Sequence, residues 1–292
     1  MPEGSAGDPR AGYDRQMPRD AQLETDALLE LCRGSVQDIR AELKRLPTRE
    51  EREKVLRRGM GGDETTQIDE AAEQAVVRRL EALDVPGFTL VSEELGERVF
   101  GAGGSLRVVL DPIDGSINAK RGIPFFSVSL AVADGDKMRD VFFGYVYDFG
   151  SGEEWTARRG KGAWLNGEVL GATRPKDEIE LLAFEATETA KIAERAPSVV
   201  GLAKRLRIMG SLALSLCHLA AGRLDAVCSL KPARSIDVAA GQLLVREVGL
   251  AIEFVDGEAS FLDSQLDLES RSRIAAAGTE ELCRALSDRL RS

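Results

Sequence analysis

The sequence has little of what several common enzyme chemistries require. Its 292 residues include a single histidine, His218, which lies in the apolar helical pattern SLALSLCHLAAG. That pattern predicts a packed helix residue rather than a catalytic base. Ser-His-Asp hydrolysis, zinc hydrolysis and histidine phosphorelay are therefore disfavoured. Carboxylates, hydroxyls, backbone groups and a hard metal ion are left to perform any catalysis.

The sequence also lacks paired cysteines, long apolar runs and a basic net charge, which limits the binding partners and the cell compartment that we expect. The four cysteines are scattered without CxxC spacing, which is typical of reduced cytoplasmic thiols rather than of a disulfide framework. No apolar run reaches membrane-spanning length, and the N-terminus has no hydrophobic signal core. The net charge of −10 disfavours nucleic-acid binding and docking on an anionic membrane. We expect a cytoplasmic protein with neither kind of partner.

The composition is that of a globular protein, with 43% hydrophobic and 30% charged residues. Its length fits one large domain or two moderate ones. Residues 1–20 are rich in glycine, proline and charge, which predicts a disordered tail. The pattern of elements changes near residue 150, which predicts an N-terminal α+β lobe over 21–150 and a C-terminal α/β lobe over 151–292.

Hydrophobic periodicity predicts the main elements. Helices are expected over residues 21–46, 69–83, 211–221, 237–248 and 279–290. Strands are expected over residues 88–91, 106–110, 126–132, 141–147, 181–184, 224–230 and 274–277. Asn166-Gly167 predicts a hairpin turn. The charged, glycine-containing segment 51–66 predicts a mobile loop.

The segment LRVVLDPIDGSIN, residues 106–118, has the clearest functional signal. A β-branched run leads into Asp111 and Asp114 on a tight turn, which Pro112 stiffens and Gly115 leaves open to a close backbone approach. Two carboxylates three residues apart repel each other, and strand ends are where α/β sheets hold ligands. This placement predicts a metal cation.

Three further acidic residues lie where predicted elements begin or end. Glu93 follows strand 88–91, Asp69 opens a helix after TTQI, and Asp237 opens the helix SIDVAAGQLL. An acid at a helix start, taken alone, is most often a cap or a dipole partner. An all-oxygen donor set without His or Cys favours Mg²⁺ or Mn²⁺ over zinc.

The motifs DPIDGSIN, SIDVAAG, SEELG and TTQID together resemble those of the inositol monophosphatase and fructose-1,6-bisphosphatase superfamily of Mg²⁺-dependent, lithium-sensitive phosphatases. The resemblance covers roughly residues 55–255. The flanking text MGGDETTQID, NAKRGIPFFSVSL and FFGYVYD is most similar to the archaeal-type branch, whose members often accept both inositol monophosphate and fructose 1,6-bisphosphate. The resemblance implies an α/β (α+β) fold built as a five-layer α/β/α/β/α sandwich, an active site between two lobes, and a homodimer.

The resemblance also implies a set of metal ligands. Glu93, Asp111 and the backbone carbonyl of Ile113 would hold one Mg²⁺. Asp111, Asp114 and Asp237 would hold a second, and a third, weaker ion would lie near Glu93. Two such ions about 3.5–4 Å apart clamp a phosphate in two-metal sites.

Roles for the reacting groups follow from the same resemblance. The catalytic candidates are Asp69, Ser116 and Glu93. Ser116 stands where the family has threonine, and its hydroxyl, paired with Asp69, would orient and help deprotonate the attacking water. The N–H groups of Gly115 and Ser116 lie at a turn expected to open a helix, where anions bind favourably.

The substrate end departs from the family pattern. Gly210-Ser211-Leu212 has leucine where alanine is usual, and Ile236 replaces the tryptophan before Asp237. Inositol-specific members have a carboxylate in the segment that here contains Lys231 and Arg234, either of which could meet a second phosphate or be a solvated surface charge. Arg207, Lys120 and Arg121 are further candidates with structural alternatives. The substrate-binding candidates are Asp114, Gly115, Ser116, Gly210, Ser211, Lys231, Arg234 and Asp237.

The leading hypothesis is a Mg²⁺-dependent phosphomonoesterase for a small polyol or sugar phosphate, with a small-molecule phosphate ester as its partner. The alternatives within the superfamily are a fructose-1,6-bisphosphatase and a 3′,5′-bisphosphate nucleotidase or NADP phosphatase. A non-catalytic scaffold on the same fold is disfavoured because all four carboxylate ligands are present. A nucleotide-binding enzyme is disfavoured because the chain has no Walker A sequence and no GxGxxG after a strand.

Overall fold

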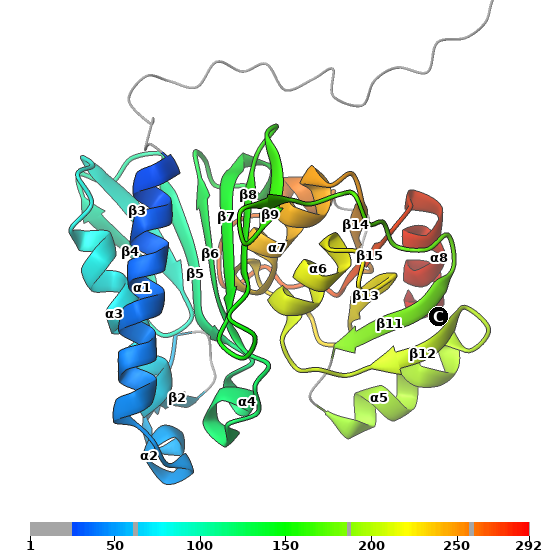
Figure 1. The fold of residues 1–292 in the computed structure, drawn as a ribbon, viewed down its shortest axis with the longest axis horizontal. Coiled ribbons are helices and arrows are strands. Elements are labelled where there is room, and N and C mark those ends of the chain that lie inside the picture. The colour runs from blue at the N-terminus through cyan, green and yellow to red at the C-terminus, as the bar shows by residue number, and fades with distance from the viewer. Residues whose placement is uncertain (1–24, 61–63, 186–187, 257–259, 292) are drawn as a thin grey trace, which may run out of the picture.

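The computed structural model describes residues 25–60, 64–185, 188–256 and 260–291, and Figure 1 shows their arrangement. The tail predicted over residues 1–20 lies outside the described residues. In the described part of the chain, no helix is long and apolar enough to cross a membrane.

The larger sheet has eight strands in the order β10-β9-β8-β7-β6-β5-β3-β4. All neighbours are antiparallel except β3 and β5, which run parallel. Asn166 and Gly167 have φ of 52° and 84°, as the predicted hairpin turn between β9 and β10 requires. The strands are β3 (Gly87–Ser92), β4 (Gly96–Gly101), β5 (Arg107–Asp114), β6 (Ser127–Ala133), β7 (Val141–Asp148), β8 (Glu154–Arg158), β9 (Gly162–Leu165) and β10 (Glu168–Val169).

The smaller sheet has five strands in the order β12-β11-β13-β15-β14. Strand β11 runs parallel to β12 and to β13, whereas β15 is antiparallel to both of its neighbours. The strands are β11 (Ile179–Glu185), β12 (Ala203–Arg207), β13 (Ala226–Ser229), β14 (Ala251–Phe254) and β15 (Ile274–Ala277).

Helices separate and cover the two sheets (Figure 1). Their apolar stripes form one core on each side of the larger sheet and a third against the smaller one. The outer layer beside the larger sheet holds α1 (Thr25–Arg45) and α3 (Gln67–Glu81), the central layer α6 (Leu212–Ala220) and α7 (Ser235–Glu247), and the far layer α5 (Thr189–Arg195) and α8 (Glu280–Arg291). This order of layers confirms the predicted α/β/α/β/α sandwich.

Short helices complete the chain. They are α2 (Arg49–Glu53), α4 (Ser116–Arg121) and the 3₁₀ turns η2 (Met138–Asp140), η3 (Ala196–Val199) and η4 (Phe261–Asp263).

The loop predicted over residues 51–66 is wrong in part, because regular elements occupy most of its described residues, while residues 61–63 lie outside the described part of the chain. Thr48 and Glu51 form a capping box that starts α2, and β1 (Val55–Arg58) pairs antiparallel with β2 (Glu64–Thr66). These strands have too few residues to show an alternation. The lobe boundary near residue 150 stays a prediction, although the larger sheet continues past it to Val169.

Candidate active site

The DPIDGS motif lies at the end of strand β5. The strand continues through Asp114, so the expected turn at Asp111 is wrong, and a shift of register between Asp111 and Asp114 instead marks a local irregularity. The Asp111 carboxylate accepts a hydrogen bond from the Ile113 N–H at 3.0 Å. Gly115 then caps α4 with φ of 87°, a left-handed conformation that favours glycine. The motif therefore links a buried strand to a helix start.

Asp114 connects this strand end to helix α6 in the central layer. Its Oδ2 accepts hydrogen bonds from the Ser211 hydroxyl and from the Ala213 N–H at 2.8 Å. Ser211 is the N-cap of α6, as predicted. A Cβ at Gly115 would come within 3.1 Å of the Gly210 carbonyl oxygen. The structure thus brings the predicted substrate residues at 114–115 and 210–211 side by side.

Glu93 and Asp237 meet at the side chain of Arg234. Glu93 lies in the turn between β3 and β4, and Asp237 lies in the first turn of α7. The Arg234 Nη2 donates to Glu93 Oε1 at 2.7 Å and to Asp237 Oδ1 at 3.2 Å. The Arg234 backbone N–H also donates to Asp237 Oδ2 at 2.7 Å. Two segments far apart in the sequence are therefore joined by one guanidinium.

Burial and neighbouring negative charge raise the pKa values of Glu93, Asp111 and Asp114. Burial, together with Asp237, raises the pKa of Glu93 to about 7, against the lowering effect of Arg234. Burial and Asp237 likewise raise the pKa of Asp114 to about 7, against the hydrogen bond from Ser211. The pKa of Asp111 lies well above its usual value because of burial, Glu93 and Asp114. One guanidinium does not balance this group of four acids, so a further cation would relieve it.

Asp69 lies in the first turn of α3 and has its own set of partners. Its Oδ2 accepts hydrogen bonds from the Thr66 N–H at 3.1 Å and from the Thr66 hydroxyl at 2.6 Å. These bonds give Asp69 the helix-capping role that the sequence also allowed. Lys120 of α4 pairs with the same oxygen at 2.9 Å. The expected direct pair with Ser116 is not among the hydrogen bonds of the described residues. Asp69 Oδ1 is buried and has no partner in this part of the chain.

The donor set fits a hard divalent cation, because all its donors are oxygens and they are buried or partly buried. In the described ranges, however, no three His, Cys, Asp or Glu side chains already converge on one ion position. Each acid instead accepts from a protein donor. Those donors are Arg234 for Glu93 and Asp237, Ser211 and Ala213 for Asp114, and the Ile113 N–H for Asp111.

Sequence reasoning missed Glu73, which supports the turn that carries Glu93. This side chain is fully buried on α3. Its Oε1 accepts from the Ser92 hydroxyl, the Glu94 N–H at 3.2 Å and the Leu95 N–H at 3.1 Å. Burial raises the pKa of Glu73, against the hydrogen bond from Ser92. An acid within the apolar stripe of a helix was the signal that could have identified it.

Glu185 is a second residue of this kind. It ends β11, where Oε2 accepts from the Gly210 N–H at 2.9 Å and Oε1 accepts from the Ser215 hydroxyl at 2.6 Å. Glu185 thereby fixes the turn that presents Ser211 to Asp114. An acid closing the apolar run LLAFE was its sequence signal.

The remaining cationic candidates lie toward the surface. Lys231 is exposed, Arg121 pairs with Glu53 at 3.6 Å, and the exposed Arg207 donates to the Leu206 carbonyl. His218 stacks on Phe125 at 5.8 Å between ring centres, in agreement with a packed helix residue.

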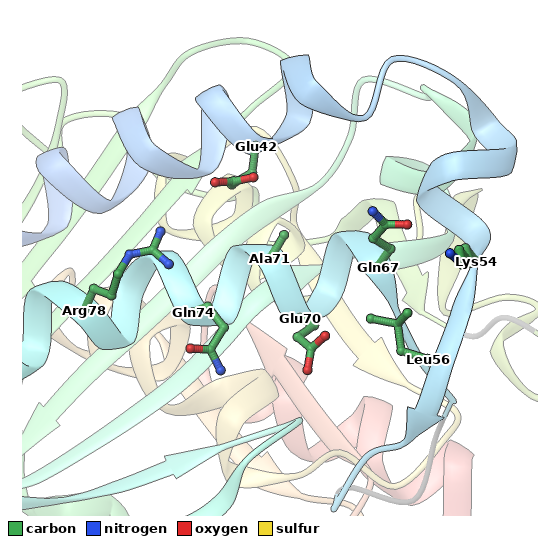
Figure 2. Close-up of a pocket in the computed structure, with 8 residues that line it drawn as sticks. All are labelled: Glu42, Lys54, Leu56, Gln67, Glu70, Ala71, Gln74 and Arg78. Atoms are coloured by element: carbon green, nitrogen blue, oxygen red, sulfur yellow. The ribbon is translucent and has the colours of Figure 1, made fainter.

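A separate pocket of about 520 Å³ lies on the outer face of α3 (Figure 2). Glu42, Lys54, Leu56, Gln67, Glu70, Ala71, Gln74 and Arg78 line it. None of the predicted site residues is among them, so this pocket is not the candidate active site.

Comparison with known proteins agrees with the geometry. The model of the inositol monophosphatase family matches residues 20–291. A fructose-1,6-bisphosphatase/inositol-1-monophosphatase from Archaeoglobus fulgidus is 36% identical over 257 residues, which cover 87% of this chain and 94% of that protein. The protein of the same name from Thermococcus kodakarensis is 34% identical over 233 residues, covering 80% and 85%. The crystal structure of an inositol monophosphatase-fructose 1,6-bisphosphatase has a TM-score of 0.75 at 30% identity, covering 89% of this chain and 98% of that one.

These similarities confirm the superfamily, its archaeal-type branch and the enzyme class that the motifs predicted. The chain belongs to the inositol monophosphatase family, and it is a phosphoric monoester hydrolase of a family that depends on a metal ion.

Proposed function

We propose that this chain hydrolyses the phosphate monoester of a small polyol or sugar, with Mg²⁺ held by the acids at the ends of β5 and β3 and the start of α7. The observation that carries the proposal is the mutual electrostatic effect of Glu93, Asp111, Asp114 and Asp237, which come from three separate segments. Burying this much negative charge destabilises the fold unless a cation offsets it.

Two or three Mg²⁺ ions per site are proposed, with Mn²⁺ as a substitute. The proposed ligands of the first ion are Glu93, Asp111 and the Ile113 carbonyl, and those of the second are Asp111, Asp114 and Asp237. When bound, such ions polarise phosphate oxygens and lower the pKa of bound water.

The chain's own residues then position the water and the phosphate. Asp69 has one buried oxygen that no described residue hydrogen-bonds, which suits it to hold a proton from the attacking water. Ser116 begins α4 and would orient that water with its hydroxyl. The N–H groups of Gly115 and Ser116 at the start of this helix would bind phosphate oxygens. Since phosphoryl transfer depends mainly on positioning and charge neutralisation, the absence of a second histidine is no obstacle.

The names of the archaeal relatives support inositol 1-phosphate and fructose 1,6-bisphosphate as the first substrates to test. Gly210 and Ser211 border Asp114 and Gly115 and would contact the sugar or polyol. Lys231 is exposed and free to meet a second phosphate, whereas Arg234 is engaged with Glu93 and Asp237. Fructose-1,6-bisphosphatase activity is therefore the second function we propose.

The test is release of inorganic phosphate with and without Mg²⁺ from inositol 1-phosphate, fructose 1,6-bisphosphate, a 3′,5′-bisphosphate nucleotide and NADP. We expect Mg²⁺-dependent release from at least one of the first two. Release from the nucleotides alone would reassign the substrate. No release from any of the four by the folded protein would contradict an enzymatic role and favour a scaffold.

We also infer a homodimer and a cytoplasmic location. All four cysteines are free and buried, which agrees with a reducing compartment. The dimer rests on family resemblance, and sedimentation equilibrium tests it.

A further inference from the structure

We propose that Arg234 is an internal cation that holds Glu93 and Asp237 together until a divalent metal ion replaces it. The inference rests on the metal site proposed above and adds a competitor that belongs to the chain itself.

The geometry of Arg234 carries the inference. One guanidinium nitrogen, Nη2, lies 2.7 Å from Glu93 Oε1 and 3.2 Å from Asp237 Oδ1. The Arg234 side chain is only 9% exposed, and those of Glu93 and Asp237 are each 18% exposed. A charged hydrogen bond in such a buried place is stronger than one on the surface. These hydrogen bonds therefore hold the Arg234 guanidinium firmly between the two carboxylates.

The oxygens that Arg234 binds are those that the metal site needs. Glu93 is a proposed ligand of the first ion and Asp237 of the second, so a single positively charged group contacts one ligand of each. A guanidinium and a divalent ion repel each other strongly at contact distance in a buried site. Metal binding to Glu93 and Asp237 therefore requires the guanidinium to leave.

The local backbone allows the guanidinium to leave without unwinding helix α7. The Arg234 N–H donates to Asp237 Oδ2 at 2.7 Å and fixes the first turn of the helix. On the Arg234 side that bond uses only the backbone N–H, so rotation of the Arg234 side chain leaves it in place. The second oxygen, Asp237 Oδ1, is the one that becomes free for a metal ion.

The competition makes a measurable prediction about metal affinity. In Arg234→Gln the side chain keeps a polar group but loses the positive charge. We expect its dissociation constant for Mn²⁺, measured by titration calorimetry, to be at least tenfold lower than that of the wild type. We expect the metal-free variant to melt at a lower temperature than the wild type, because the acids lose their counter-cation.

A matched control is Arg159→Gln. Arg159 pairs with Asp134 at 2.7 Å, and both side chains are partly buried, at 22% and 18% exposure. Asp134 follows β6 next to Ala133, which pairs with Arg107 at the opposite end of β5 from Asp111. This variant loses an ion pair and some thermal stability, but its Mn²⁺ affinity should equal that of the wild type.

A second measurement uses the wild-type protein and does not depend on any variant folding. Arginine modification by 2,3-butanedione, followed by mass spectrometry of the peptide that contains Arg234, reports access to this guanidinium. We expect protection without metal and faster modification with saturating Mn²⁺, while the peptide with Arg159 reacts equally in both conditions.

The outcomes separate the two proposals. If the wild type binds Mn²⁺ but Arg234→Gln binds it no more tightly, or if Arg234 stays equally protected with the metal, the competition is wrong and the metal site stands. If neither protein binds Mn²⁺ at all, both proposals are wrong.

Discussion

The acid Asp225 and the group of four acids around Asp111 differ in how their negative charge is satisfied. Asp225, directly before strand β13, accepts hydrogen bonds from the backbone N–H groups of Lys176 at 2.9 Å, Glu180 at 3.1 Å and Leu181 at 2.9 Å. The acids around Asp111 instead raise one another's pKa and depend on Arg234 for charge. Burial alone therefore does not distinguish a structural acid from a site acid. The difference is whether the fold supplies enough donors.

The largest expected effect is on activity, when one carboxylate charge is removed from the site acids and, for comparison, from Asp225. Asp111→Asn and Asp237→Asn should lower phosphate release by about 10²–10³-fold or more, because each removes a proposed metal ligand from the electrostatic centre. Asp225→Asn should retain its turnover per folded molecule. The NH₂ group of the asparagine would face a backbone N–H donor, so the free energy of unfolding should fall by about 1–3 kcal/mol.

Phosphate assays at limiting Mg²⁺ and urea unfolding measure the two effects. Near-normal activity of Asp111→Asn, or a lost activity of folded Asp225→Asn, would remove the distinction.

The next effect sharpens the comparison within the site. Ser116→Ala removes a hydroxyl that we place on the water rather than on the metal. Turnover should fall by about 10²-fold, within the range for positioned proton-transfer groups, while Mn²⁺ affinity stays unchanged. Kinetics and titration calorimetry on the same sample distinguish this role. Weaker metal binding with unchanged turnover at saturation would show that Ser116 is a ligand instead.

A smaller effect is expected from Glu73→Gln, which acts on the turn beyond the ligands. Its Oε1 accepts from the Glu94 and Leu95 N–H groups that follow Glu93. Replacing the carboxylate by an amide weakens these charged hydrogen bonds, so metal affinity should fall by about tenfold, as for other residues that orient ligands. Glu185→Gln is the matched control, because it supports the Gly210 turn and should raise KM more than it weakens metal binding.

The smallest effect is the pH dependence of the metal-free protein. The pKa of Glu93 rises from 4.5 to about 7 in the folded state, so the folded state binds more protons than the unfolded state between these values. Stability is therefore greatest at the acidic end of this window and falls as the pH rises through it. Urea unfolding in EDTA should show a smaller fall for Glu93→Gln than for the wild type, and equal slopes would show that Glu93 does not titrate here.

Much of the fold was predictable because long periodic segments form its centre. The helix over Ser211–Ala221 and the strand over 274–277 were expected within about a residue of where they lie. Both are buried apolar segments, and Ser211 and Gly222 mark the ends of the helix. Strands β1, β12 and β14 were missed because they are short and lie at edges, where alternation is weak. The family and the order of layers followed from motif order rather than from any single motif.

The candidate site was predictable in its acids but not in their partners. Asp111, Asp114 and Asp237 have a motif signature, whereas the side chain that reaches them is set by tertiary packing. Arg234 was predicted at the substrate, and nothing in the sequence indicated its contact with Glu93, which precedes it by 141 positions. Lys120, rather than Ser116, pairs with Asp69 for the same reason. A single sequence does not give the distances between side chains of remote segments.

A crystal structure of the protein soaked in Mn²⁺, with anomalous diffraction, would test the account most directly. We predict anomalous peaks within coordination distance of Asp111 and Asp237, with the Arg234 guanidinium displaced from Glu93. Two results would contradict the assignment of these acids as the catalytic centre. One is manganese bound elsewhere. The other is a soaked crystal with no bound manganese, in which Arg234 still joins Glu93 to Asp237.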